Sequence, residues 1–194
     1  IGADNDLMAD ASMKYHVVLA QRIGKFLAEQ KAFWFEEPFQ PEDIDSYAAL
    51  RGTVGVPVAA GENEFGVQGF RELIRAKAVD IVQPDASRCG GISEVWKTAR
   101  LAAAAGLAFA PHTWSDAVAV IANAHVVAAM PNGLTVEMDQ TGNPMIDELL
   151  VGGRQNVDAS TGVSVLGEPA ATIGSTKQGR CLVLSQLPHE PGEP

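Results

Sequence analysis

Six acidic or histidine side chains recur along this sequence at intervals of 23 to 27 residues. Each follows a short apolar run and stands just before a turn. Such a period accommodates one strand, one helix and two loops, and the carboxyl ends of parallel strands meet at one edge. The sequence therefore predicts that six side chains share one rim of a parallel sheet or barrel: Asp10, Glu36, Glu62, Asp85, His112 and Glu137.

The first three of these side chains are carboxylates from successive strands, Asp10, Glu36 and Glu62. Like charges that converge on one site repel one another unless a cation lies between them. A hard ion that prefers octahedral oxygen ligands, such as magnesium, suits such a set. An acid at a strand end can instead cap a helix or form an ion pair, but three in successive units favour a metal site.

The next two side chains, Asp85 and His112, end neighbouring strands and are therefore candidates for contact across the rim. A carboxylate bonded to one ring nitrogen fixes the tautomer and raises the basicity of the other nitrogen, which gives a general acid or base near neutral pH. The alternative is a core histidine bonded to a backbone carbonyl. Glu137 is a candidate to contact a substrate carboxylate opposite the metal; beside Asp139, it can also be a surface acid.

The elements that must position these groups alternate between strands and helices. In the stretch 33–38, an apolar strand runs into Glu36 and Glu37, a proline ends it, and strand alternation sends the two acids to opposite sides. Similar patterns predict an α/β fold with parallel, right-handed crossovers and both sheet faces covered. The strands are expected within 6–12 and over 32–37, 56–60, 78–83, 107–110 and 134–136, and the helices over 13–30 with Ser12 as N-cap, 42–50, 68–76, 93–105 and 116–130.

Composition narrows the class of protein. A chain of 194 residues with 46% hydrophobic residues can bury a core, and a net charge of −10 argues against nucleic acid or anionic lipid as a partner. Two distant cysteines suggest neither a disulfide framework nor a zinc site, so we expect a cytoplasmic location. The longest uncharged run, 117–136, is interrupted by polar residues and proline, so we expect no membrane span.

The pattern of strands and helices changes after about residue 150. Glycine-rich turns there separate short β-like pieces over 163–166 and 181–184. We expect residues 1–150 to carry the metal and catalytic residues, residues 151–187 to form a C-terminal segment that returns toward another domain, and residues 188–194 to be a disordered tail.

The ordered motifs resemble the enolase superfamily, in its mandelate racemase and muconate lactonizing enzyme family. The likeness covers residues 5 to 150 and is specific, because each motif lies at a strand end and all occur in one order. The motifs are Leu7-Met8-Ala9-Asp10, Trp34-Phe35-Glu36-Glu37-Pro38, Gly61-Glu62-Asn63, Pro84-Asp85 with Gly90-Gly91, Pro111-His112-Thr113-Trp114 and Glu137-Met138-Asp139.

The resemblance implies a role for each of the six side chains. Asp10, Glu36 and Glu62 would bind Mg²⁺, Asp85 and His112 would form the catalytic dyad, and Glu137 would contact the substrate carboxylate. The shared chemistry is abstraction of the proton alpha to a carboxylate, which gives an enediolate. Glu36 would face the metal, and Glu37 would support it.

The resemblance also implies that part of the fold lies outside this sequence. Members of the family carry an N-terminal capping domain and two earlier barrel strands, the second of which ends in a Lys-x-Lys motif. This chain would therefore hold strands three to eight of a (β/α)8 TIM barrel and a C-terminal segment. Because it also starts at Ile1 rather than methionine, we expect an incomplete barrel with an exposed sheet edge. For the full-length protein we expect a homo-oligomer.

The expected activity is dehydration of an acid sugar, a small carboxylate. Residue 12 is serine, whereas some acid-sugar dehydratases carry a catalytic histidine at that position, so that subgroup is disfavoured. The alternatives are a racemase or epimerase of a 2-hydroxy acid, which needs a second base on the opposite face of the substrate, and a catalytically silent barrel fragment.

Overall fold

A single parallel sheet organises the chain, whose computed structural model describes residues 6–139, 143–149, 157–158, 162–163 and 181–185. The sheet has six strands in the order β5-β4-β3-β2-β1-β8, and neighbouring strands are parallel throughout. The strands are β1 (Asp6–Asp10), β2 (Trp34–Glu36), β3 (Val58–Ala60), β4 (Ile81–Val82), β5 (Ala108–Phe109) and β8 (Cys181–Ser185). Two further strands, β6 (Val157–Asp158) and β7 (Gly162–Val163), pair with each other in antiparallel fashion.

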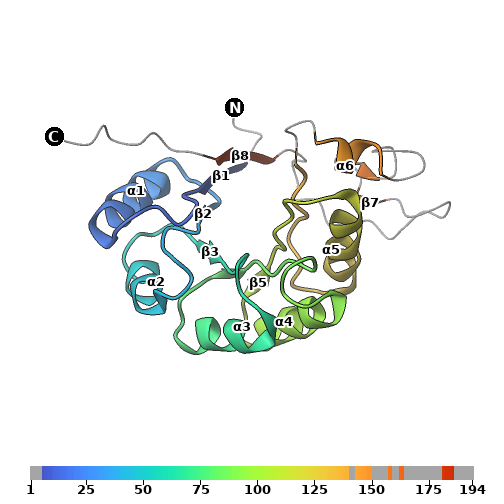
Figure 1. Cartoon of the computed structure of the whole chain (residues 1–194). Coiled ribbons are helices and arrows are strands. Elements are labelled where there is room, and N and C mark those ends of the chain that lie inside the picture. Colours follow the sequence, from blue (N-terminus) through green and yellow to red (C-terminus); the bar gives the residue numbers. More distant parts are fainter. Residues whose placement is uncertain (1–5, 140–142, 150–156, 159–161, 164–180, 186–194) are drawn as a thin grey trace.

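A helix follows each of the first five strands, and these helices form an arc around the outside of the sheet (Figure 1). Acidic side chains cap two of them, because the Asp43 carboxylate accepts from Ser46 N and the Asp116 carboxylate accepts from Val118 N and Ala119 N. The helices are α1 (Val17–Glu29), α2 (Ile44–Arg51), α3 (Gly66–Arg75), α4 (Ile92–Ala104), α5 (Ala117–Ala129) and the short α6 (Pro144–Asp147).

The two faces of the sheet carry different apolar clusters. The larger cluster joins the strands to the helices, and the smaller one lies on the other face. Because side chains alternate along a strand, Phe35 belongs to the larger cluster while Trp34 belongs to the smaller one. Glu36 therefore shares the inner face with Trp34, and it ends β2 on that side.

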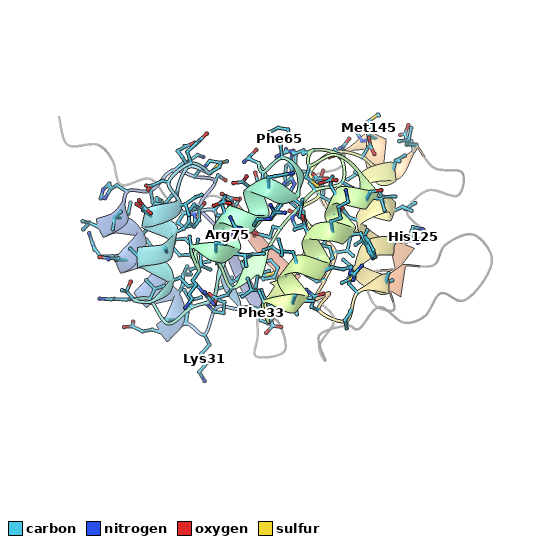
Figure 2. All side chains as sticks on the ribbon, turned by 90° about the horizontal axis from the view of Figure 1, so that it is seen from below. Lys31, Phe33, Phe65, Arg75, His125 and Met145 are labelled. Atoms are coloured by element: carbon cyan, nitrogen blue, oxygen red, sulfur yellow. The ribbon has the colours of Figure 1, made fainter. Side chains whose placement is uncertain are left out.

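The carboxyl ends of the strands lie at one end of the molecule. Figure 2 shows Phe65, which follows β3, and Met145 at one end, and Lys31 and Phe33, which precede β2, at the other. The turns that carry the acidic and histidine side chains therefore share the end with Phe65. This arrangement confirms the predicted α/β class and the order of strand and helix.

Two local predictions were wrong. Ser12 does not cap α1: it has a positive φ of 47° and donates to Asp10 from its amide and hydroxyl, while His16 caps the helix. The segment 134–136 forms no strand; Gly133 makes an isolated bridge with Phe109, and Leu134 N donates to Phe109 O. The pairing with β5 therefore stops after one bridge and one hydrogen bond, and 134–136 does not continue it as a ladder.

The free edge expected at β1 is paired in this structure. Strand β8 lies parallel to β1, from the pair Asp6 and Cys181 to the pair Asp10 and Ser185. An edge strand presents unpaired amide and carbonyl groups, and an extended apolar segment can satisfy them. The predictions for 164–166 and for the tail 188–194 lie outside the described residues. No described helix has the length and apolar character that crossing a membrane requires.

Candidate active site

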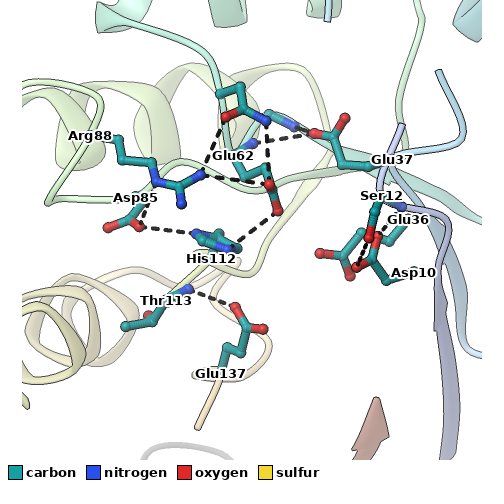
Figure 3. A network of polar contacts seen from close by, with 12 residues as sticks. Asp10, Ser12, Glu36, Glu37, Glu62, Asp85, Arg88, His112, Thr113 and Glu137 are labelled. Carbon is teal, nitrogen blue, oxygen red and sulfur yellow. Dashed lines mark hydrogen bonds and ion pairs between the residues drawn. The ribbon is translucent and has the colours of Figure 1, made fainter. Parts of the chain in front are cut away.

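Strand register places the first two predicted metal ligands side by side. Asp10 and Glu36 are direct partners in the β1–β2 ladder, so their side chains leave the sheet on the same face. The Trp34 indole N–H donates to Glu36 Oε2 at 2.8 Å, and Ser12 N donates to Asp10 Oδ1 at 2.7 Å. Glu36 is thus oriented by a residue of its own strand, and Asp10 by Ser12 in the turn that follows β1 (Figure 3).

The third predicted ligand points elsewhere. Glu62 Oε2 lies 3.3 Å from His112 Nε2, and Glu62 Oε1 lies 3.6 Å from Arg88 Nη1. Figure 3 shows the Glu62 carboxylate turned toward these two cations and away from Asp10 and Glu36. Among the described residues, no three acidic, histidine or cysteine side chains are close enough together to hold a metal ion. Glu62 would have to change partners to join such a site.

Asp85 and His112 are in direct contact, as their positions in the sequence predicted. His112 Nδ1 lies 3.0 Å from Asp85 Oδ2, and both side chains are buried. Ser87 donates to Asp85 Oδ1 from its amide and its hydroxyl, each at 2.8 Å. The loop after β4 therefore holds the Asp85 carboxylate in place, and this carboxylate in turn holds the Nδ1 edge of the His112 ring.

The charges around the dyad favour an ion pair. Burial alone would lower the pKa of His112, but the hydrogen bond to Asp85 and the charges of Glu137 and Glu62 outweigh it and raise that pKa. Burial alone would raise the pKa of Asp85, but the hydrogen bonds from His112 and Ser87 hold that pKa below its usual value. Both shifts favour the charged forms, a doubly protonated ring and an ionised carboxylate.

Negative charge accumulates on the inner side of this site. Burial raises the pKa of Glu36 well above its usual value, and the carboxylates of Glu137 and Asp10 add to that effect. Burial also raises the pKa of Glu137, whose Oε2 accepts from Thr113 N at 2.6 Å. These carboxylates raise one another's pKa, and a cation between them would relieve that repulsion. Their oxygen atoms are the ligands that a hard divalent cation such as Mg²⁺ prefers. Asp10, Glu36 and, after turning, Glu62 are the residues that fit it.

Glu37 occupies a separate environment from that of the predicted metal ligands. It is 1% exposed, and its carboxylate accepts from Tyr47 Oη and from Gly61 N, each at 2.7 Å. Burial raises the pKa of Glu37 to about 7. Since Gly61 directly precedes Glu62, Glu37 anchors the turn that carries the third predicted ligand, which agrees with its expected supporting role.

The sequence reading missed two side chains at this site. Arg88 bonds Asn63 Oδ1 at 3.3 Å and faces both Glu62 and Asp85. Asn123 lies on α5, is fully buried and contacts the dyad. Two features of the sequence point to them: Arg88 follows Asp85 by three residues, and Asn123 is an amide within an otherwise apolar stretch of a predicted helix. Trp114, the last residue of the Pro111–Trp114 motif, is half exposed.

Comparisons with known proteins show the family of this chain. Residues 1–164 match the family model described as enolase C-terminal domain-like. Over 171 residues the chain is 40% identical to D-galactarolactone cycloisomerase of Agrobacterium fabrum, which covers 84% of this chain and 44% of that protein.

Solved structures of similar proteins superpose on this chain. The 3,6-anhydro-D-galactonate cycloisomerase from Zobellia galactanivorans superposes with a TM-score of 0.70 at 38% identity, covering 74% of this chain and 40% of the other. L-Talarate dehydratase from Polaromonas sp. JS666, in complex with Mg and L-glucarate, gives 0.63 at 35% identity, covering 70% and 36%. The chain thus spans less than half the length of each relative.

Proposed function

This chain belongs to the enolase superfamily, in the group of mandelate racemase and muconate lactonizing enzymes, and on that premise we propose that it removes the proton alpha to a substrate carboxylate. The observation that carries the proposal is the 3.0 Å contact between Asp85 Oδ2 and His112 Nδ1. A buried carboxylate on one ring nitrogen leaves the other nitrogen, Nε2, as the group that exchanges a proton with substrate.

Each side chain of the site has its own role in the proposed reaction. Asp85 holds the imidazole in one tautomer, and His112 Nε2 takes or returns the proton at the reacting carbon. Asp10, Glu36 and Glu62 would hold Mg²⁺, which supplies positive charge to the carboxylate of the substrate as its alpha proton leaves. Glu137 accepts a hydrogen bond from Thr113 N, next to His112, and would bond the substrate carboxylate on the side away from the metal. Glu62 must leave His112 Nε2 before that nitrogen can reach a substrate.

We propose a sugar acid as the substrate and dehydration as the reaction. Dehydration breaks the bond between the beta carbon and its hydroxyl, His112 protonates the departing oxygen to give water, and the resulting enol becomes a 2-keto acid. Support comes from relatives named as arabinonate dehydratase and as L-talarate/galactarate dehydratase, at 34% and 35% identity. The dehydratase from Polaromonas was solved with Mg and a sugar acid.

Isomerisation is the second candidate, and one observation favours it. Both D-galactarolactone cycloisomerase and 3,6-anhydro-D-galactonate cycloisomerase are more similar to this chain than the dehydratases just named. A cycloisomerase or racemase moves the same alpha proton without losing water. The dyad serves either reaction, because the two differ in the step that follows proton removal.

A panel of sugar acids and their lactones distinguishes these reactions. The full chain is incubated with Mg²⁺ in D₂O and followed by ¹H NMR, with an EDTA-treated sample as the control. Formation of a 2-keto acid supports dehydration, and deuterium incorporation or ring opening without loss of water supports isomerisation. If no substrate changes although the chain is folded and binds Mg²⁺, this chain alone is a silent barrel fragment and the proposal is wrong for it.

A further inference from the structure

One buried amide touches both halves of the dyad. Asn123 lies in the middle of α5 and is 0% exposed. Its Nδ2 donates to His112 O and to Thr113 Oγ1, each at 3.0 Å, and approaches Asp85 Oδ1 at 3.4 Å. Its Oδ1 accepts from Ala86 N at 3.0 Å. Every polar atom of this amide is therefore used.

These contacts join the two loops that follow the paired strands β4 and β5, beyond the last residues that the ladder holds together. Asp85 and Ala86 follow β4, whereas His112 and Thr113 follow β5. Ser87 bonds the Asp85 carboxylate from within its own loop, so it cannot set the position of His112. Asn123 reaches both loops from a third element, the helix packed behind them. Asn123 thus adds a second link between the two loops, beside the direct contact of Asp85 with His112.

We propose that Asn123 is a positioning residue that sets the orientation of the Asp85–His112 pair. Its oxygen fixes the backbone after Asp85, and its two N–H donors fix the backbone of His112 and the hydroxyl beside it. Buried in an otherwise apolar stretch of α5, the amide is costly unless all its hydrogen bonds are made. Moving either loop breaks some of them, so the amide favours one relative placement of the two loops. The inference rests on the proposed function for its catalytic consequence.

A pair of matched substitutions separates positioning from general stability. Asn123→Asp keeps the acceptor for Ala86 N but turns a carboxylate oxygen toward His112 O, Thr113 Oγ1 and Asp85 Oδ1. The control is Asn132→Asp, because Asn132 Nδ2 also donates to two backbone carbonyls, Ala99 O and Leu107 O, both at 3.1 Å. Both variants place an acid where a buried donor stood, and only the first touches the dyad.

The readout is the state of the His112 ring in the metal-free chain. Spectra of ¹⁵N-histidine-labelled protein report which ring nitrogen carries the proton, and His112→Asn assigns the signals. At a pH where the ring is neutral, wild type and Asn132→Asp are expected to be protonated mainly on Nδ1, because Asp85 Oδ2 at 3.0 Å from Nδ1 is a nearer acceptor than Glu62 Oε2 at 3.3 Å from Nε2. Asn123→Asp is expected to show a second tautomer, protonated on Nε2. If Asn123→Asp does not fold, Asn123→Ser, which retains one hydroxyl donor, is measured in its place.

Turnover gives the second readout. On a substrate that the wild-type chain converts, Asn123→Asp should lower kcat by about 10- to 100-fold with little change in KM, while Asn132→Asp should leave both near wild type. A single Nδ1-protonated tautomer and unchanged kcat in the Asn123 variant would overturn the inference. If the wild-type chain converts no substrate, the proposed function fails while the NMR comparison still decides the role of Asn123.

Discussion

Glu36 and Glu37 are neighbours in the sequence, yet their carboxylates serve different parts of the structure. Glu36 Oε2 accepts from the Trp34 indole at 2.8 Å on the inner face of the sheet, and Glu37 Oε2 accepts from the Tyr47 hydroxyl at 2.7 Å beside α2. Glu37 has a positive φ of 38°, which turns the chain directly after β2. One acid is thus available to a metal ion, and the other secures the turn behind it.

Stability should fall as Glu37 loses its proton. Burial raises the pKa of Glu37 from 4.5 to about 7, so between these values the folded chain keeps a proton that the unfolded chain has lost. This contribution is complete below pH 4.5 and disappears as the pH rises through about 7. It amounts to about 3 kcal/mol at most. Glu37→Gln lacks this titrating group, so we expect the free energy of unfolding of the variant to depend less on pH than that of the wild type.

Urea unfolding of both proteins in EDTA at pH 4.5 and pH 7.5 measures this difference. The wild type should lose about 2 to 3 kcal/mol more than Glu37→Gln over this range. Because both proteins carry the same other titrating groups, their contributions cancel in the comparison. Equal losses in the two proteins would show that Glu37 ionises normally in the folded chain.

Trp34 should control the affinity for Mg²⁺ through Glu36. Trp34→Phe keeps an aromatic ring in the inner cluster but removes the donor that orients Glu36 Oε2. Removing a partner that orients a metal ligand typically costs 10- to 100-fold in affinity, so we expect a loss of about tenfold by calorimetry. The control is Trp96→Phe on the exposed side of α4, where Arg100 lies over the ring. Equal affinities in the two variants would contradict this role of Trp34.

Gly61 should tolerate no larger side chain. Its φ of 128° disfavours other residues, and an added Cβ would lie 2.5 Å from Phe70 Cε1. We expect Gly61→Ala to destabilise the chain by roughly 3 kcal/mol, of which about 1 kcal/mol is conformational. Gly106→Ala also places alanine at a positive φ, 72°, but with nothing within 4 Å, and should cost only about 1 kcal/mol. Thermal unfolding compares them, and similar losses would refute the steric argument.

The sequence was sufficient for the order of elements and for the contact between Asp85 and His112. Strand ends are marked by a switch from apolar to polar residues, and parallel topology brings neighbouring ends together. Neither the position of a strand end nor the order of parallel strands depends on side-chain rotamers. The segment 134–136 was misread because a short apolar run has the same pattern whether it forms a ladder or makes only a single bridge with its neighbour.

The direction of individual side chains could not be predicted in the same way. Glu62 was expected among the metal ligands, but in the structure it pairs with His112 and Arg88. Its orientation depends on which charges surround it, and those come from loops far apart in the sequence. Asn123 was passed over for a related reason, since a polar residue in an apolar helix gains meaning only when the loops that it bonds are known.

In the proposed mechanism, His112 moves the alpha proton of a sugar acid in a reaction that needs Mg²⁺. Its most direct measurement is the rate at which wild type and His112→Asn exchange that proton with D₂O, or eliminate water after removing it, followed by ¹H NMR at saturating Mg²⁺. Asparagine can still bond Asp85, so the fold is expected to survive. We predict reaction by the wild type and a rate about 10²- to 10⁴-fold lower in the variant. Equal rates in the two proteins would contradict the assignment of His112.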